Sequence, residues 1–373
     1  MGTKSLKCLA TINEGFEEVC ALELQEAGAE VLQKERGKVF FKCKSPELLA
    51  ELACTARSPS SIYLLLATLG KEGEGLGTVP FEEWLDDKKS FVLETSGLPK
   101  EEELAKKVIE VIKSRTGAKV VWKQPDVRFV LVDRDVPLLC VDVAGEDLGR
   151  RDYRIFLGSK SLKGNIAYSL LRLAGYDGSQ TLLDPFCRSG EIPIEAALFA
   201  SRSPVRLNSK AKLPIARLKP FSNYCFEELF ERLAKRSEKP KAKIFAIDRS
   251  FAALSKASKN AKIAGVERWI EFKKLEIEHL ANSLIQESID LVVSVPLQPS
   301  RSLPTEFVQK VYDKLWLQLE QIVTKNGKIL FAFNNKKGVE LLRTIADKAF
   351  YVHLEKPFLI GKESWIAIGF CKP

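Results

Sequence analysis

Apolar residues follow two patterns along the second half of the chain. Short apolar runs of strand length are separated by longer stretches in which apolar residues recur at the spacing of a helix. This alternation predicts an α/β, Rossmann-like domain with a mostly parallel sheet, and two final strands without a helix between them predict an antiparallel edge. The predicted strands are 181–183, 243–247, 270–272, 290–295, 327–333, 351–354 and 365–370, and the predicted helices are 192–201, 226–236, 251–264, 278–286, 307–323 and 337–350.

The first half predicts two smaller α+β units. Strands at 7–12, 31–32, 38–43 and 62–69, with helices at 16–27 and 46–56, give the βαββαβ order of a ferredoxin-like domain over residues 1–69. Phe16, Val19, Leu22 and Leu24 are expected on the buried side of its first helix. A second unit over residues 70–155 has predicted strands at 90–96, 127–132 and 138–143 and helices at 81–85 and 100–117, and a linker at 156–179 carries a helix at 162–174.

Composition excludes several classes of protein. The 373 residues are 45% hydrophobic and 29% charged, as in ordinary globular proteins, and no apolar run is long enough to cross a bilayer. No signal-peptide core is visible, so we expect no membrane partner. The eight cysteines lie far apart, which argues against a metal site and favours the reducing cytoplasm. His279 and His353 are the only histidines, so a histidine-based triad is nearly excluded.

Positive charge is concentrated in the second half of the chain. The net charge is +9, and residues 176–373 contribute 32 basic and 22 acidic side chains, against 26 and 27 in residues 1–175. Residues 201–243 alone hold 12 basic and 4 acidic side chains. A local surplus of this kind favours a polyanion-binding surface, although a solvated basic face without a partner is a common alternative.

A strand, a tight turn and a helix meet at Asp184-Pro-Phe-Cys187-Arg188-Ser189-Gly190. Turns of this kind present backbone N–H groups to a ligand at the carboxyl end of a strand in an open α/β sheet. Asp248 and Glu276 follow the next two predicted strands. Three acids at the ends of three successive strands are typical of a site that surrounds a nucleoside, and an acid in the place of Asp248 can bind both ribose hydroxyls. A helix N-cap is the alternative role for Asp248.

The chain resembles the THUMP-containing class I RNA methyltransferases, most closely the branch that methylates the exocyclic N2 of guanosine in tRNA. The resemblance covers nearly the whole length. It rests on 10–17 and 37–41 in the ferredoxin-like domain, Val141-Asp-Val-Ala-Gly145 to Arg154 at the end of a THUMP domain (70–155), the linker helix, Asp184 to Gly190, and 257–266. Residues 180–373 would then form the methyltransferase domain, and the protein is expected to be a monomer.

This resemblance implies a role for particular residues. S-adenosyl-L-methionine (AdoMet) would lie over the turn, held by Asp184, Pro185, Cys187, Ser189 and Gly190, with Asp248 at its ribose and Glu276 at its adenine amino group. No metal would be needed. Ser294 and Pro296 would contact the target amine. The residues expected to contact tRNA or another structured RNA are Arg150, Arg151, Arg154, Lys163, Lys210, Lys212, Arg217 and Arg301.

Two motifs depart from those of the family. The family turn is D-P-F-C-G-S-G-T, but this chain has Arg188 and Glu191 in place of its first glycine and its threonine. The family motif T-N-P-P-Y/F-G is replaced by residues including Ser294, Val295 and Gln298, and valine offers no acceptor for a target amine. Three hypotheses therefore remain: an active RNA methyltransferase, a relative that binds RNA without methylating it, and a small-molecule or nucleotide-binding protein on this fold.

Overall fold

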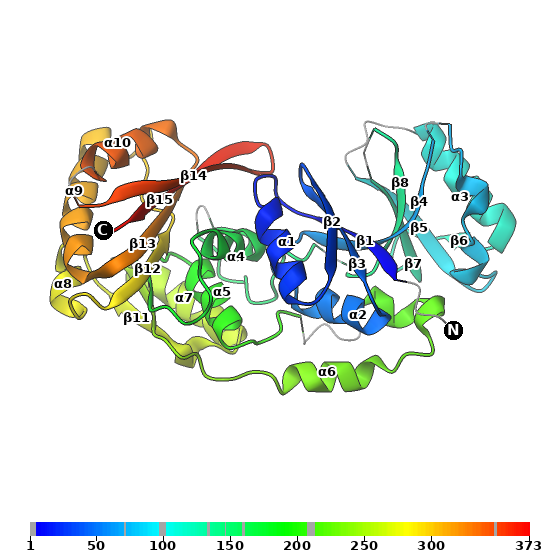
Figure 1. The fold of residues 1–373 in the computed structure, drawn as a ribbon, viewed down its shortest axis with the longest axis horizontal. Coiled ribbons are helices and arrows are strands. Elements are labelled where there is room, and N and C mark those ends of the chain that lie inside the picture. The colour runs from blue at the N-terminus through cyan, green and yellow to red at the C-terminus, as the bar shows by residue number, and fades with distance from the viewer. Residues whose placement is uncertain are drawn as a thin grey trace. The chain divides into compact units, whose positions relative to one another are not determined.

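Two β-sheets organise the chain in the computed structural model, which describes residues 5–70, 72–96, 102–132, 135–145, 147–158, 161–206, 213–346 and 349–373 (Figure 1). Each sheet belongs to one compact unit. Unit 1 comprises Met1–Ile12, Cys20–Leu148 and Arg206–Lys235, and unit 2 comprises Asn13–Val19, Gly149–Val205 and Arg236–Pro373.

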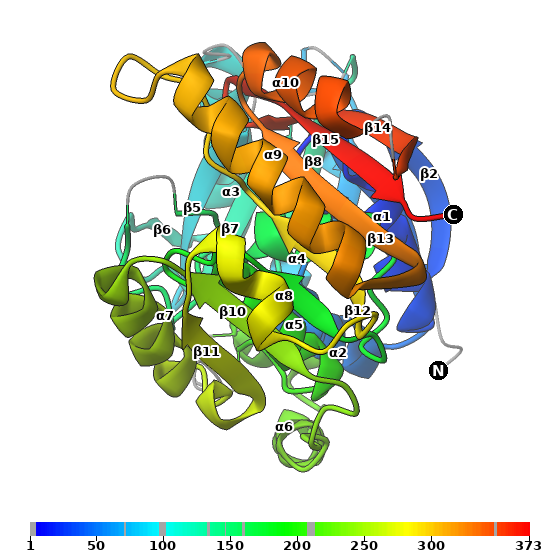
Figure 2. The same cartoon turned by 90° about the vertical axis from the view of Figure 1, so that its left-hand side faces the viewer.

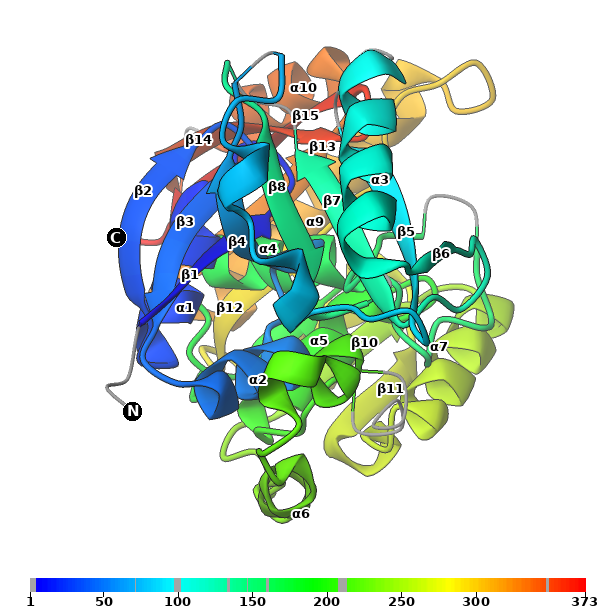
Figure 3. The ribbon, with the colours of Figure 1, turned by 90° about the vertical axis from the view of Figure 1, so that its right-hand side faces the viewer.

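The sheet of unit 1 has the strand order β2-β3-β1-β4-β8-β7-β5-β6. Its first four strands are β1 (Leu6–Thr11), β2 (Glu30–Glu35), β3 (Lys38–Cys43) and β4 (Ser61–Thr68), and with α1 (Glu17–Glu26) and α2 (Pro46–Thr55) they confirm the predicted ferredoxin-like arrangement. The other four are β5 (Ser90–Ser96), β6 (Lys119–Val120), β7 (Val127–Val132) and β8 (Leu138–Asp142). Antiparallel pairing of β4 with β8 joins the two halves into one sheet, and α3 (Glu102–Thr116) packs on β5 (Figure 3).

The described part of the basic 201–243 stretch packs largely within unit 1. Residues 206–235 belong to that unit, and they include α6 (Phe226–Ala234). The Ile215 amide donates to the Val143 carbonyl (3.4 Å), and the ring of Phe221 meets Trp84 edge to face at 6.2 Å. The segment is therefore anchored by apolar contacts, which leaves its basic side chains on the outside.

The sheet of unit 2 has the order β11-β10-β9-β12-β13-β15-β14. Its strands are β9 (Leu182–Asp184), β10 (Ile244–Asp248), β11 (Ile270–Lys274), β12 (Ile289–Ser294), β13 (Val323–Phe333), β14 (Tyr351–Ile360) and β15 (Glu363–Cys371). The first five are mutually parallel, whereas β15 pairs antiparallel with both β13 and β14. The predicted parallel sheet with an antiparallel edge is confirmed. Carboxyl ends of the parallel strands share one rim, where ligands of open α/β sheets bind.

Helices cover both faces of this sheet. On one side lie α4 (Gly164–Leu173), α5 (Glu191–Ala200) and α7 (Phe251–Ile263), and on the other α8 (Leu280–Ser283), α9 (Thr305–Ile322) and α10 (Lys336–Ala346) (Figure 1). The long helix α9 runs across β12 and β13 (Figure 2), and its buried Tyr312, Trp316 and Leu319 pack with Phe331 of β13 in the main core cluster. No helix in the described ranges is long and apolar enough to cross a membrane.

Some predicted details were wrong. Leu22 is 45% exposed, whereas Phe16, Val19 and Leu24 are buried as expected. The helix predicted at 278–286 is shorter, because a 3₁₀ turn at Ile277–His279 precedes α8 and the backbone is extended at Leu284. The strand predicted at 327–333 begins earlier, at Val323, and the strand predicted at 351–354 extends to Ile360.

Candidate functional site: a cavity at the rim of the parallel sheet

The turn that follows β9 is held closely against its neighbours. The Cys187 amide donates to the Ile247 carbonyl (2.9 Å), and the Gly190 amide donates to the Cys187 carbonyl (2.7 Å). Gly190 has a φ of 87°, and a Cβ added there would lie 2.9 Å from the Cβ of Ala257 on α7. Both the backbone conformation and the close approach of α7 therefore require glycine at this position.

Arg188 occupies the turn where the resemblance expects a glycine. Its φ of 50° is in the left-handed region, which costs a side-chain-bearing residue free energy. The Arg188 amide donates to Oδ2 of Asp248 (3.1 Å), and its guanidinium NH2 donates to the Pro296 carbonyl (3.2 Å). Burial lowers the pKa of the guanidinium below its ordinary value, although Asp184, Asp248 and Glu191 act in the opposite direction. The side chain thus links the first turn of the rim to the loop after β12.

Asp184 and Ser294 form a buried pair behind the turn. Their exposed fractions are 2% and 0%, and the Ser294 hydroxyl donates to Oδ1 of Asp184 at 2.5 Å. Burial raises the pKa of Asp184 to about 7, because loss of water outweighs the stabilising bonds from Ser294 and from the Phe186 amide. The Ser294 hydroxyl and the Asp184 carboxyl are therefore already hydrogen-bonded to each other.

A second buried polar group lies at the start of α5. The Ser189 hydroxyl donates to Oε1 of Glu191 (2.9 Å) and lies 2.6 Å from Oγ of Ser161. The carboxamide of Asn260 donates to the carbonyls of Ser189 (3.0 Å) and Phe156 (3.1 Å). Burial raises the pKa of Glu191 above its ordinary value, and the bond from Ser189 opposes this shift. Hydrogen bonds therefore connect Phe156 and Ser161 to the turn.

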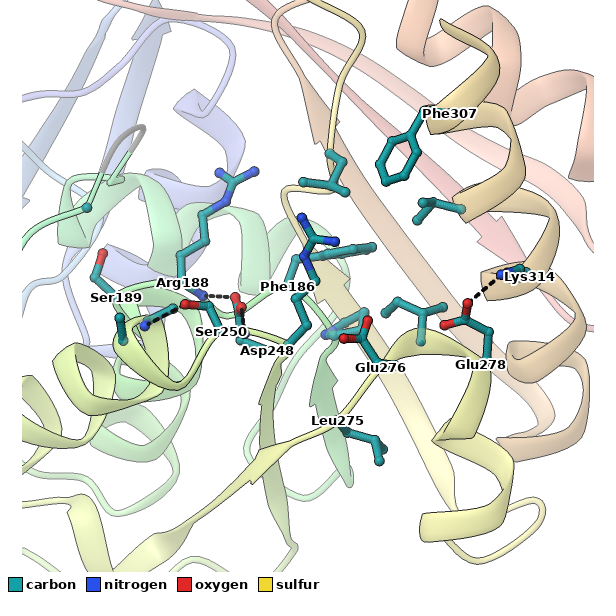
Figure 4. Close-up of a pocket in the computed structure, with 18 of the residues that line it drawn as sticks. Phe186, Arg188, Ser189, Asp248, Ser250, Leu275, Glu276, Glu278, Phe307 and Lys314 are labelled. Atoms are coloured by element: carbon teal, nitrogen blue, oxygen red, sulfur yellow. Dashed lines mark hydrogen bonds and ion pairs between the residues drawn. The ribbon is translucent and has the colours of Figure 1, made fainter. Parts of the chain in front are cut away.

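A cavity of about 520 Å³ opens beside the turn. This volume lies within the range of small-molecule pockets, roughly 300–1,000 Å³. Asp248 from the end of β10 and Glu276 after β11 stand on its wall, and Phe186, Leu275 and Phe307 supply apolar surface (Figure 4). Asp248 accepts amide hydrogen bonds from Arg188 and from Ser250 (2.9 Å), while Ser250 itself is the N-cap of α7. An apolar wall with two carboxylates can hold a flat base and the hydroxyls of a sugar.

The residues predicted to bind the cofactor divide into two groups. Pro185, Ser189, Asp248 and Glu276 line the cavity. Asp184, Cys187 and Gly190 are buried in or beneath the turn, and are absent from the cavity lining. The predicted catalytic residues, Ser294 and Pro296, do not line the cavity either. The Ser294 hydroxyl donates to Asp184, and the Pro296 carbonyl accepts a hydrogen bond from Arg188.

The residues predicted to contact RNA also differ in their surroundings. Arg150, Lys163, Arg217 and Arg301 are exposed. Arg151 is buried, with its Nε 2.8 Å from Oε1 of Glu195 on α5. Arg154 is half-buried, and its Nε lacks a hydrogen-bond partner in the described part of the chain. Lys210 and Lys212 lie outside the described residues.

Sequence reasoning did not name most of the cavity wall. Phe186 lies within the turn, and Leu275 and Ile277 flank Glu276, so proximity to named residues was the available signal. Phe307 and Lys310 come from α9, and nothing in the sequence connects that helix with the turn. No cluster of three or more His, Cys, Asp or Glu suited to a metal ion occurs among the residues that the structure describes.

Family models match both parts of the chain. A model described as "RMKL-like, methyltransferase domain" matches residues 151–353, and one described as "RlmL ferredoxin-like domain" matches residues 7–52. The ribosomal RNA large subunit methyltransferase K/L of Aeromonas hydrophila is 27% identical over 296 residues. That alignment covers 74% of this chain but 41% of the relative, so the chain spans less than half of that protein's length.

Solved structures share the fold over the full chain. A possible methylase from Clostridium difficile 630 has a TM-score of 0.80 at 19% identity, with 99% of each chain covered. TrmN from Thermus thermophilus has a TM-score of 0.72 at 20% identity, covering 99% of this chain and 100% of that one. A methyltransferase-type protein complexed with SAH has a TM-score of 0.79 at 19% identity, with 99% of each chain covered.

Proposed function

Because the chain belongs to the family of RMKL-like methyltransferases, we propose that its cavity holds the adenosine part of AdoMet and that the protein acts on structured RNA. The observation that carries this proposal is the position of Asp248 and Glu276, two of the three carboxylates on the cavity wall. Asp248 ends β10 and Glu276 follows the adjacent β11, so both belong to the same rim. Asp248 would accept from the ribose hydroxyls and Glu276 from the adenine amino group, with Phe186 and Leu275 against the base.

The target that we propose is the exocyclic N2 of a guanosine in tRNA. AdoMet supplies a methyl group that an amine can attack directly. The contribution of the chain would be to orient that amine, with the Pro296 carbonyl on the loop after β12 as its acceptor. A THUMP role for residues 70–155 and contacts from exposed Arg150, Lys163 and Arg217 would supply RNA affinity. A monomer in the cytoplasm completes the proposal, and the free thiols of the eight cysteines are typical of that reducing compartment.

A second candidate function is RNA binding without methyl transfer. The specific observation in its favour is that both predicted polar contacts of the target amine are already engaged within the chain. Ser294 donates to Asp184 and is fully buried, and the Pro296 carbonyl accepts from Arg188. A target amine would have to displace the guanidinium to reach that carbonyl. Loss of an orienting acceptor costs orders of magnitude in rate.

Calorimetric titration with AdoMet and SAH tests the cofactor site. We expect binding to the native protein and its loss in Asp248→Ala, since the ribose would lose its carboxylate partner. Asp313→Ala, which removes an exposed acid of α9, is the matched control and should bind normally. Undiminished affinity in Asp248→Ala, or no binding to the native protein, would contradict the proposal. Transfer of tritiated methyl to unmodified tRNA then separates the two candidate functions.

A further inference from the structure

Basic side chains outnumber acidic ones around the cavity. Its wall carries five of the former and three of the latter, a net charge of +2. AdoMet carries a sulfonium and an ammonium against one carboxylate, so its net charge is positive, and a positively charged wall opposes that net charge more strongly where water is excluded. The basic members are Arg188, Arg249, Lys256, Lys310 and Lys314, and the acidic members are Asp248, Glu276 and Glu278.

Ion pairing within the wall leaves a larger excess of positive charge on the side of the turn. Glu278 is bound to Lys314, so that pair cancels. Lys256 donates to the neutral Leu157 carbonyl (3.1 Å) and forms no ion pair with the residues that the structure describes. Arg249 and Lys310 have no ionic partner within the ranges that the structure describes.

Arg188 is one of two cations of the wall that are partly buried, the other being Lys256. In Figure 4 its side chain extends away from Asp248, and only its backbone amide bonds to that carboxylate. The guanidinium has a neutral carbonyl as partner, and no carboxylate lies within ion-pair distance of it among the described residues. Asp184 and Glu191 are the other acids nearby, and both are occupied by serine hydroxyls. The guanidinium makes no direct ion pair with these acids, so a bound anion would pair with it directly, and its planar fork suits phosphate or carboxylate.

We propose that the cavity selects an adenosine ligand with a negatively charged 5′ group, an adenine nucleotide, over the sulfonium of AdoMet. The inference rests on the adenosine site proposed above. It changes the chemical group expected at the 5′ position of the ribose from a sulfonium to an anion. Phosphate would lie within reach of Arg188 at the turn, with Lys256 and Arg249 adding to the field. This selection would weaken AdoMet binding without abolishing it, which gives a physical reason for the second candidate function.

Calorimetry of the full chain with AMP, adenosine, SAH and AdoMet tests this selection. We expect AMP to bind at least about tenfold tighter than adenosine, and AdoMet to bind no tighter than SAH, a zwitterion without net charge. Arg188→Gly should remove most of the AMP advantage and strengthen AdoMet binding. Arg202→Gly is a matched control, because Arg202 is also an arginine with positive φ (55°), is exposed, and lies outside the cavity. It should leave all four affinities unchanged.

Two further results test whether the charge of Arg188 selects the ligand. Arg188→Gln keeps the bulk and removes the charge, so it covers the case in which the glycine variant does not fold, and it should also lose the AMP advantage. If the native protein binds adenosine and prefers AdoMet to AMP, or if Arg188→Gln keeps the preference for AMP, charge selection is overturned while the adenosine site stands. If none of the four compounds binds, the proposed adenosine site itself is lost, and the selection with it.

Discussion

Asp142 shows how one buried carboxyl can make the stability of this protein depend on pH. It ends β8, is 2% exposed, and accepts hydrogen bonds from the amides of Ala144 (3.0 Å) and Gly145 (2.8 Å). Burial nevertheless raises its pKa from 3.8 to about 7. The native state therefore binds a proton more readily than the unfolded chain between these values, so stability falls as pH rises through this window and changes no further above it. Asp184 behaves in the same way.

Asp142→Asn should reduce this dependence. The amide oxygen of the introduced asparagine can still accept from both backbone groups, but the side chain has no charge to desolvate. Differential scanning calorimetry at pH 5 and pH 7.5 should show a smaller drop in melting temperature for the variant than for the native protein. Asp177→Asn is the control. The pKa of Asp177 is lowered, so its contribution to stability changes only at pH values below 5. An equal drop in the variant and the native protein would refute the assignment.

Helix α5, which follows the turn, carries a buried acid that forms an ion pair, and its sequence should have suggested such a partner. Glu195 is an acid with no exposure in helix α5, where every other residue except Glu191 is apolar, and such a group requires a partner. Arg151 supplies it, with Nε 2.8 Å and NH2 3.3 Å from the two carboxylate oxygens, and the Tyr153 hydroxyl donates to Oε1 (2.9 Å). Sequence reasoning grouped Arg151 with Arg150 and Arg154 as expected RNA contacts, since partners distant in sequence are not visible in a local pattern.

Removing one member of this pair should be more harmful than removing both. Arg151→Leu leaves a buried carboxylate without its main counter-charge, and we expect a loss of about 3–5 kcal/mol in the free energy of unfolding. The double variant Arg151→Leu/Glu195→Leu should lose less, because no charge remains buried. Urea denaturation of both variants measures this difference. A double variant that is less stable than the single one would show that the pair contributes in another way.

Strand and helix positions were predictable where periodicity alone decides them, and less so where the backbone is irregular. The strands at Ser90–Ser96 and Val127–Val132 match their predicted bounds. The start of β13 was missed, because the polar Lys325 and Asn326 interrupt its apolar pattern. Asn326 has a φ of 64°, and the register between β12 and β13 shifts in this region, so the strand continues through an irregularity.

The charge of the whole chain bears on RNA affinity. A net charge of +9 favours association with any polyanion, and counter-ion release makes such binding weaken with salt. Sequence could predict this tendency, together with the acids of the rim. It could not predict the cavity wall, because residues of α9 and of the segment after β11 come together only in the folded domain. It also did not predict that Arg188 would donate to the Pro296 carbonyl.

Arg150→Ala should weaken tRNA binding and lower the slope of log affinity against log salt by about 1, as expected for the loss of one phosphate contact. Lys362→Ala is the matched control, because it removes one charge from an exposed turn outside the predicted contact set. Fluorescence anisotropy with labelled tRNA at several salt concentrations measures both slopes. Affinity that does not change with salt in the native protein would contradict RNA binding through phosphates.

The division of the chain into units constrains the order in which it can fold. The chain passes between them five times, after residues 12, 19, 148, 205 and 235. A single proteolytic cut therefore cannot release either unit intact. On the ribosome, the β-strands of unit 1 emerge early. The buried apolar residues Leu213, Ile215 and Phe221, which belong to the same unit, are synthesised about seventy residues after β8. Until then the nascent protein exposes apolar surface, and at that stage it would be most dependent on chaperones.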